Sequence, residues 1–246
     1  MTDRLLQLAR EAARRAYAPF SGAPAAAALA DRAGRWLAAP RVESASFPLS
    51  VPALQGSWAL ASVAGLRPER LVLSRPPSDE DAAFVAATWP HLDRVGDAFA
   101  SDGEVAELRA EPVSLLRNGE PDDEAVRAAE RAVVPASGFR VGAAVRDVRG
   151  RTVIGANVEH PSDWTRGLCA ERVALVAAQA AGLGPIQTVS VACVAAPGGS
   201  PCGGCRQLLA ERAPDATIRI WGGDSVRETT AAALLPDAFV GDGLRA

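Results

Sequence analysis

The sequence contains no lysine and no excess of positive charge. Its 26 basic residues other than histidine are all arginine, against 29 acidic residues, so the formal net charge is −3 and the pI is near 5.5. A protein that holds nucleic acid mainly through its phosphates needs a positive surface, because neutralising phosphate charge supplies most of that affinity. We therefore expect no nucleic-acid partner.

Long apolar runs are also missing. No uninterrupted stretch approaches the roughly 18 apolar residues of a membrane-spanning helix. The first residues lead into an amphipathic helical pattern rather than a signal peptide. Only four cysteines occur, all in the second half of the chain, which does not resemble the disulfide framework of a secreted domain. We expect a cytoplasmic protein with no membrane partner.

The sequence does contain a long internal repeat. Two helical patterns end alike, at Tyr17–Gly22 and Val133–Gly138, which lie 116 residues apart. The offset then changes gradually along the chain: 116 from Glu43 to Glu159, 117 from Ala53 to Ala170, 125 from Pro77 to Cys202, and 119 from Leu115 to Leu234. This drift indicates two tandem copies of one fold. We expect domains over residues 1–118 and 119–246, linked by the turn-prone segment Arg117–Pro121.

Helical and strand patterns alternate within each copy. Amphipathic helices are expected to open the two copies, over residues 3–18 and from residue 122. In the second copy we expect a hairpin over 139–147 and 151–159, helices over 168–181 and 206–212, and strands over 188–196 and 217–221. This order predicts an α/β protein made of two three-layer α/β/α domains, each with a mixed β-sheet.

Three of the four cysteines are spaced as metal ligands. Cys202 and Cys205 flank a Gly-Gly turn that lets both sulfurs face one ion, and Cys169 supplies a third sulfur. Three thiolates leave one position of tetrahedral Zn²⁺ open, as in catalytic sites. Glu171 lies two residues after a ligand, within reach of that position. A closed structural site is the alternative, and its fourth ligand would be Cys193 or His160.

These residues belong to a longer series of motifs. Five segments occur in order across nearly the whole second copy: Phe139–Ala144, Asn157–Glu159, Cys169–Arg172, Pro201–Gln207 and Leu234–Phe239. With them the second copy resembles the cytidine deaminases that bind zinc through three cysteines. The resemblance implies the cytidine-deaminase-like fold, one Zn²⁺ per chain, and hydrolytic deamination of cytidine or deoxycytidine in pyrimidine salvage. The partner would be a small pyrimidine nucleoside.

The resemblance also implies roles for individual residues. The three cysteines would bind zinc, which lowers the pKa of a bound water from about 15.7 towards 7. Glu171 would move protons from that water to N3 of cytosine and to the leaving ammonia. Arg172 and Gln207 would orient the thiolates and offset their charge. Six residues would contact the substrate: Phe47, Phe139, Asn157, Glu159, Trp164 and Ala170.

The first copy lacks the metal-binding residues. It has Pro52, Pro77 and Glu80 at the cysteine positions and Leu54 in place of Glu171, so we expect it to bind no zinc. Cytidine deaminases form tetramers in which neighbouring subunits contribute residues to each active site. By resemblance we expect a homodimer that imitates such a four-domain tetramer, with Phe47 of the first copy completing the site around Glu171.

Two alternatives remain open at this point. The second copy departs from the family at residues 160–164, where His-Pro-Ser-Asp-Trp replaces the usual Asn-Ala-(Ser/Ala)-Tyr. This change favours, as one alternative, deamination of another cytosine- or aminopyrimidine-type compound. The other is a non-catalytic, zinc-stabilised binding or regulatory protein, although a structural zinc would not require Glu171.

Overall fold

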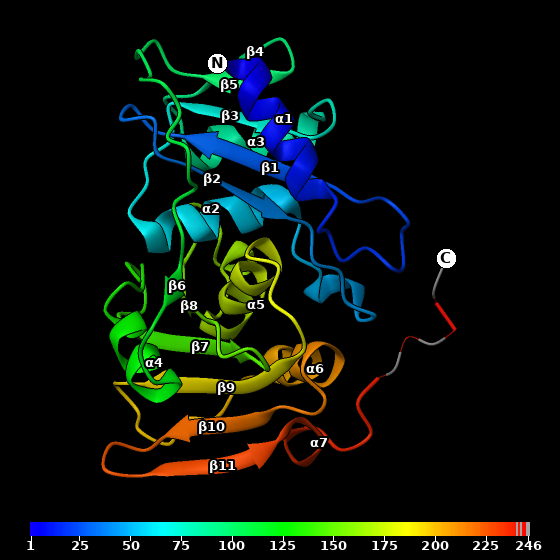
Figure 1. Cartoon of the computed structure of the whole chain (residues 1–246), viewed down its shortest axis with the longest axis vertical. Coiled ribbons are helices and arrows are strands. Elements are labelled where there is room, and N and C mark those ends of the chain that lie inside the picture. Colours follow the sequence, from blue (N-terminus) through cyan, green and yellow to red (C-terminus); the bar gives the residue numbers. More distant parts are fainter. Residues whose placement is uncertain (240, 242, 245–246) are drawn as a thin grey trace.

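The computed structural model describes residues 1–239, 241 and 243–244, and these form two lobes (Figure 1). The first lobe contains α1 (Thr2–Ala13), β1 (Ala26–Ala30), β2 (Trp36–Pro40), the 3-10 helix η1 (Phe47–Leu49), α2 (Ala53–Ala64), β3 (Arg70–Leu73), α3 (Asp79–Thr88), β4 (Asp93–Val95) and β5 (Ala98–Ala100). The second contains β6 (Leu116–Arg117), α4 (Pro121–Ala129), β7 (Val141–Asp147), β8 (Thr152–Ala156), η2 (Trp164–Arg166), α5 (Ala170–Ala180), β9 (Ile186–Cys193), α6 (Gly203–Arg212), β10 (Thr217–Trp221), β11 (Val226–Thr230) and α7 (Ala231–Leu234).

Each lobe is built on its own sheet with helices on both faces, which confirms the α/β fold. The strand order is β2-β1-β3-β5-β4 in the first lobe and β11-β10-β9-β7-β8-β6 in the second. Side chains of β1 alternate between the faces of the first sheet. Ala28 and Ala30 pack with Leu5 and Leu8 of α1, whereas Leu29 packs in the core that α2 and α3 cover.

Two glycines set how closely the helices of the second lobe approach their sheet. A Cβ atom at Gly142 would lie 2.0 Å from the Ala125 carbonyl oxygen of α4. A Cβ atom at Gly155 would lie 2.3 Å from the Ala174 nitrogen of α5. No side chain fits at either position, so glycine lets both helices lie directly on the sheet. The position of α5, the helix that follows Cys169, therefore depends on Gly155.

The predicted repeat is visible in matching backbone bridges and loop anchors. Four isolated bridges form two pairs with offsets of 116 and 117 residues: Tyr17 to Val42 and Val133 to Val158, then Val42 to Val51 and Val158 to Leu168. Asp31 accepts hydrogen bonds from the backbone and guanidinium of Arg35, as Asp147 does from Arg151. Equal contacts at equal offsets indicate that the two copies share their strand–loop–helix framework.

The last hairpin distinguishes the two lobes. In the second lobe β10 pairs in parallel with β9, and this sheet is mixed. In the first lobe the later strand of the hairpin, β5, pairs with β3 in the antiparallel direction and leaves β4 at the edge. Every pairing in the first sheet is therefore antiparallel, so the mixed sheet expected in both copies occurs only in the second. The order of strands in a hairpin depends on contacts distant in sequence, which local patterns do not reveal.

Several element bounds differ from those expected. The first helix ends at Ala13 rather than residue 18, because residues 14–16 continue only through i+3 turn hydrogen bonds. The hairpin strands and both later helices of the second lobe lie within or beside their predicted ranges, and Thr217–Trp221 agrees throughout. The domain boundary after residue 118 stays a prediction. The preceding strand β6 pairs with β8, so residues 116–117 already lie in the second sheet.

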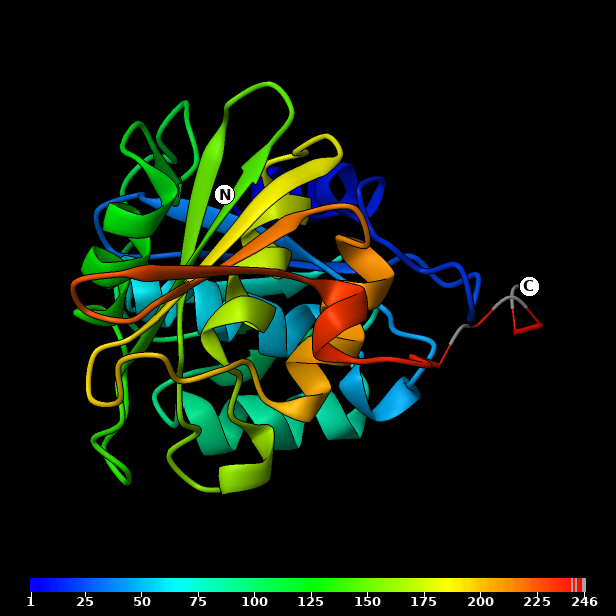
Figure 2. The ribbon, with the colours of Figure 1, turned by 90° about the horizontal axis from the view of Figure 1, so that it is seen from below.

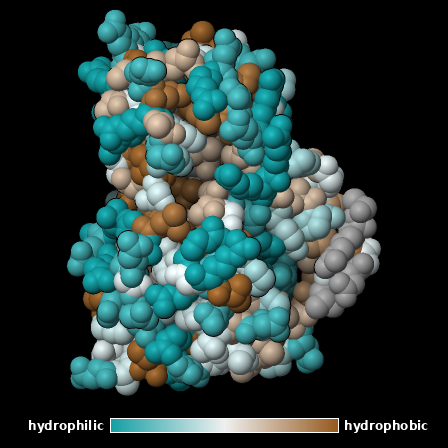
Figure 3. All heavy atoms as spheres, in the orientation of Figure 1, coloured by the Kyte–Doolittle hydropathy of each residue, from teal (hydrophilic) through white to brown (hydrophobic). Residues whose placement is uncertain are grey.

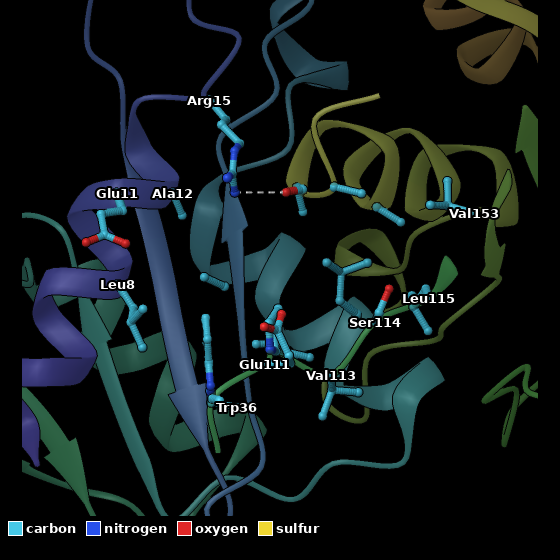
Figure 4. A pocket seen from close by; sticks show the side chains of 18 of the residues that line it. Leu8, Glu11, Ala12, Arg15, Trp36, Glu111, Val113, Ser114, Leu115 and Val153 are labelled. Carbon is cyan, nitrogen blue, oxygen red and sulfur yellow. Dashed lines mark hydrogen bonds between the residues drawn. The ribbon is translucent and has the colours of Figure 1, made fainter. Parts of the chain in front are cut away.

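The seam between the lobes is formed by α2 and α5, which lie between the two sheets (Figure 1). One apolar core continues across it. Beside the seam is a cavity of about 400 Å³. Apolar side chains gather in this hollow (Figure 3), and Arg15 crosses it to the Ala180 carbonyl oxygen at 3.3 Å (Figure 4). Its walls include the end of α5 at Ala177–Ala181, and none of the predicted site residues lines it.

No helix among the described residues is both long and apolar enough to cross a membrane.

Candidate zinc site

The three predicted ligands come together where α5 and α6 begin. Cys169 is the N-cap of α5, Cys202 is the N-cap of α6, and Cys205 lies in the first turn of α6. The sulfurs of Cys169 and Cys202 are 3.7 Å apart, and all three sulfurs lie within 4.8 Å of one another. Tetrahedral Zn²⁺ with Zn–S bonds of about 2.3 Å separates its sulfurs by roughly 3.8 Å. The cluster therefore fits a zinc ion.

No fourth protein ligand joins this cluster among the described residues. Cys193 ends β9 and is not part of it. His160 faces the first lobe instead: its Nε2 is 2.8 Å from the Thr88 hydroxyl, and its ring lies 5.0 Å from the Trp58 ring. Burial in this contact lowers the pKa of His160. Neither candidate for closing the site does so, which leaves the fourth position open to water or substrate.

The cysteine cluster combines helix N-termini that favour thiolate with contacts between the sulfurs that favour it only at Cys202. Helix N-termini carry partial positive charge and stabilise an anion placed there. Hydrogen bonds from Cys169 and Cys205 lower the pKa of Cys202, while contacts within the cluster raise the pKa values of the other two thiols. A metal that binds all three sulfurs must therefore displace their remaining protons.

Glu171 lies in the first turn of α5, and only 4 % of its surface is exposed. Burial raises its pKa, and the charge of the nearby Cys202 raises it further. A carboxyl group whose pKa is raised holds a proton more readily and can later return it. This position and environment suit the predicted acid–base role.

Arg172 connects the metal loop to the first lobe. Its Nη2 donates to the Leu49 carbonyl oxygen at 3.0 Å, and its Nε is buried without a hydrogen-bond partner. An unpaired buried donor is costly. Arg172 lies in the same helical turn as Glu171, so its positive charge suits a site whose thiolates are anionic once metal is bound. Gln207 donates to Glu211 and the Phe239 carbonyl oxygen, so any effect of Gln207 on the ligands passes through α6.

Asn157 and Glu159 hold the chain around Phe139. Asn157 accepts from the Val141 backbone and donates to the Phe139 carbonyl oxygen, both at 2.8 Å. Burial alone would raise the pKa of Glu159, but hydrogen bonds from the Ser137 hydroxyl and two backbone N–H groups lower it. Glu43 accepts the same set of bonds in the first lobe. This loop anchor therefore forms without a metal site, and the ribose contacts of Asn157 and Glu159 stay predictions.

The aromatic residues predicted at the substrate site lie on different segments. Phe139 is 45 % exposed and precedes β7. Trp164 begins η2, which is held by the first lobe: Gln55 donates to the Arg166 carbonyl oxygen at 2.6 Å. Figure 2 shows η2 beside α3 and, at the other side, η1 beside α6. Each lobe thus extends one loop onto the other.

The first lobe reaches the metal loop through η1. A Cβ atom at Gly204, between Cys202 and Cys205, would lie 2.9 Å from Leu49 Cδ2. Phe47, in the same turn, is 83 % exposed and is free to contact a ligand. The geometry therefore brings the predicted segment of the first lobe to the zinc loop, while a substrate contact of Phe47 itself stays a prediction.

The first lobe has other residues at the positions that match Cys202 and Cys205. Pro52 is the N-cap of α2, at the position of Cys169. However, α3 begins with Ser78 as its N-cap, so Ser78 and Asp81, rather than Pro77 and Glu80, occupy the positions of Cys202 and Cys205. They form a capping box, and Asp81 also binds Arg75. The Ser-x-x-Asp pattern could have identified this helix start from sequence.

One further functional residue is not apparent from the sequence. Glu211, one turn after Gln207, accepts hydrogen bonds from Ser44 and Ala45 of the first lobe. A single acidic residue on a helix carries no signal for a contact made 166 residues away, so only the folded chain reveals it.

Comparisons with known proteins point to one family. Family models described as the cytidine and deoxycytidylate deaminase zinc-binding region match residues 1–72 and 122–219, the first ending before Ser78. A cytidine deaminase from Halalkalibacterium halodurans is 37 % identical over 124 residues, which cover 49 % of this chain and 92 % of the relative. One from Mycobacterium tuberculosis is 40 % identical over 122 residues, covering 49 % and 87 %. The crystal structure of cytidine deaminase from Burkholderia pseudomallei is 38 % identical, with a TM-score of 0.45 and coverage of 48 % and 95 %.

Proposed function

The chain belongs to the cytidine deaminase family, and on this premise we propose that it hydrolyses cytidine and deoxycytidine to the uracil nucleosides and ammonia. The observation that carries the proposal is a cluster of three sulfurs, without a fourth protein ligand among the described residues, beside the buried carboxyl group of Glu171. A structural zinc site would require neither the open position nor the acid.

The reaction needs one metal contribution and one proton carrier. The three thiolates would hold Zn²⁺, which when bound would lower the pKa of a water to about 7. Glu171 accepts a proton from the attacking water at a carboxylate oxygen and delivers it to N3 of the cytosine. Glu171 then takes the remaining proton of the hydroxyl group added at C4 and passes it to the amino group, so that the C4 carbonyl forms as the C4–N bond breaks and ammonia leaves. Its buried position keeps bulk water from exchanging these protons.

The same premise assigns the substrate contacts. We propose that Asn157 and Glu159 bind the ribose hydroxyl, that Phe139 and Phe47 line the pocket, and that the Ala170 backbone binds the base. Trp164 is proposed as a further contact. Support for Phe47 comes from η1, whose Leu49 touches the zinc loop at Gly204. We further propose one Zn²⁺ per chain, because Pro52, Ser78 and Asp81 offer the first lobe no thiolate.

We propose that the altered loop at residues 160–164 serves the contact between the lobes rather than a different substrate. His160 packs against Trp58 and Phe84 of the first lobe, and Arg166 lies over the Phe84 ring. These contacts explain the unusual loop as a contact between lobes. We therefore keep the nucleosides as substrates.

We also propose a role in pyrimidine salvage in the cytoplasm and a domain boundary after residue 118. A homodimer is proposed as well, supported by the exposed side chains of Phe139 and Phe239.

A substrate panel tests this proposal. Purified protein is assayed with cytidine, deoxycytidine, cytosine, deoxycytidylate and adenosine, and ammonia release is measured. We expect the two cytidine nucleosides to be the best substrates. Preference for free cytosine or a nucleotide would refute the assigned substrate class, and no turnover of any compound by zinc-loaded protein would refute the enzyme.

A further inference from the structure

Glu211 joins the metal-bearing helix to the first lobe. It lies near the end of α6, the helix that begins with Cys202 and Cys205. Its Oε1 accepts from the Ser44 hydroxyl at 2.8 Å and from Gln207 Nε2 at 2.7 Å, and its Oε2 accepts from the Ala45 backbone at 2.9 Å. Both carboxylate oxygens are therefore used, and two of the three donors come from the other lobe.

Residues 44–50 form a compact segment, here called the bridging segment. The Ser44 backbone donates to the Ser50 hydroxyl at 3.0 Å, and the Ser46 backbone donates to the Ser44 hydroxyl at 3.1 Å. Glu211 holds its beginning, and Arg172 holds its end at the Leu49 carbonyl oxygen. The two anchoring side chains stand on α6 and α5, the helices whose first residues carry the zinc ligands. The segment is thus fixed relative to the site itself.

The same pair of contacts occurs with the lobes exchanged: a loop of the second lobe is held by helices of the first lobe. His160, 116 residues after Ser44, contacts Thr88 on α3. Arg166, 117 residues after Leu49, accepts from Gln55, which is 117 residues before Arg172. This second pair of contacts lies over helices that begin at Pro52 and Ser78 and carry no metal ligand. The molecule therefore supplies a comparison for such contacts over helices that carry no metal ligand.

We propose that Glu211 is a positioning residue for the deaminase site: by holding the bridging segment against the zinc loop, it makes the first lobe part of the nucleoside-binding surface. This inference rests on the proposed function. Glu211 has no role in the proton transfers, which belong to Glu171. Releasing the segment removes binding surface around the substrate and leaves the sulfurs and Glu171 in place, so KM rises much more than kcat falls.

The test uses Glu211→Gln, which keeps the side-chain size but replaces one acceptor oxygen by a donor. An amide N–H group would then face the Ser44 hydroxyl and Gln207 or the Ala45 N–H group, and at least one contact is lost. Losing a hydrogen bond to a charged group predicts a rise in KM of about tenfold. We expect kcat to stay within about threefold of the wild-type value and the zinc content to be unchanged.

Thr88→Val is the matched control, because it removes the equivalent contact between the lobes over the site without metal. We expect its KM to rise much less than that of Glu211→Gln, because Thr88 holds only His160, at the start of the loop that carries Trp164. In a double-mutant cycle, Ser44→Ala should raise KM in the wild type and add little in Glu211→Gln. Hydrogen exchange should increase at residues 44–50 in Glu211→Gln and not in Thr88→Val.

Three results would overturn the positioning role in an enzyme whose wild type is active: an unchanged KM in Glu211→Gln, an equal rise in Thr88→Val, or a fall in kcat alone. A wild-type protein that deaminates no nucleoside would instead remove the proposed function, and the positioning role with it. Because exchange at residues 44–50 does not depend on turnover, it separates a lost anchor from a lost reaction.

Discussion

Replacing Gly155 by alanine should weaken both the fold and the zinc site. The new Cβ atom would lie 2.3 Å from the Ala174 nitrogen and 2.5 Å from the Ala170 carbonyl oxygen, both in the backbone of α5. Ordinary contacts of this kind are more than 1 Å longer, so α5 has to move away from β8. Overpacking of this size costs about 1–3 kcal/mol, and each kcal/mol lowers the Tm of a chain of this length by about 2–4 °C.

The displacement also reaches the metal. Cys169 is the N-cap of α5, whereas Cys202 and Cys205 belong to α6, so moving one helix changes the distance between ligands. We expect zinc affinity to fall about 10- to 100-fold, as when a support of a metal ligand is lost. Calorimetry gives the Tm, and competition with a chromogenic chelator gives the zinc Kd.

Gly142→Ala provides the comparison. Its Cβ atom would lie 2.0 Å from the Ala125 carbonyl oxygen, so it displaces α4, which carries no ligand. We expect a similar loss of Tm with an unchanged zinc Kd. The reasoning fails if Gly155→Ala keeps the wild-type Kd, or if both variants lose zinc affinity equally.

Three further predictions concern acid stability, metal removal and the ligands. Hydrogen bonds outweigh burial and lower the pKa of Asp147, so its stabilisation is present above about pH 4 and is lost as pH falls through the lower native value. Asp147→Asn should therefore flatten the loss of unfolding free energy between pH 5 and about pH 2 in urea titrations; an unaltered slope would contradict this. Chelating the zinc should lower the Tm and abolish turnover, and one equivalent of Zn²⁺ should restore both. Cys205→Ser should reduce bound zinc to near zero by atomic absorption, and a full equivalent retained would refute the ligand set.

The zinc cluster was predictable because its signal is local. Cys202 and Cys205 are fixed in relation to each other by a short turn, and helix starts follow both motifs. The position of Cys169 beside the other two sulfurs was implied by the family resemblance and is visible only in the folded chain. Ala53 and Ala170, which the repeat relates by an offset of 117 residues, are the first residues of α2 and α5.

What the sequence missed depends on contacts between distant segments. Pro77 rather than Ser78 is matched to Cys202 from the sequence, because the insertion before Cys202 has no defined position until the start of α3 is known. The reversed pairing of β5 with β3 requires a choice between two strands of equal local character. Glu211 and His160 act across the seam, so their patterns carry meaning only after α2 and α5 have packed together.

The most direct test of the account is cytidine deamination by the wild type and Glu171→Gln, with zinc measured in the same samples. The account predicts one zinc per chain in both proteins and a loss of rate of about 10²- to 10⁴-fold in the variant, the usual contribution of a general acid–base group. A zinc-loaded variant with the wild-type rate, or two zinc ions per wild-type chain, would contradict it.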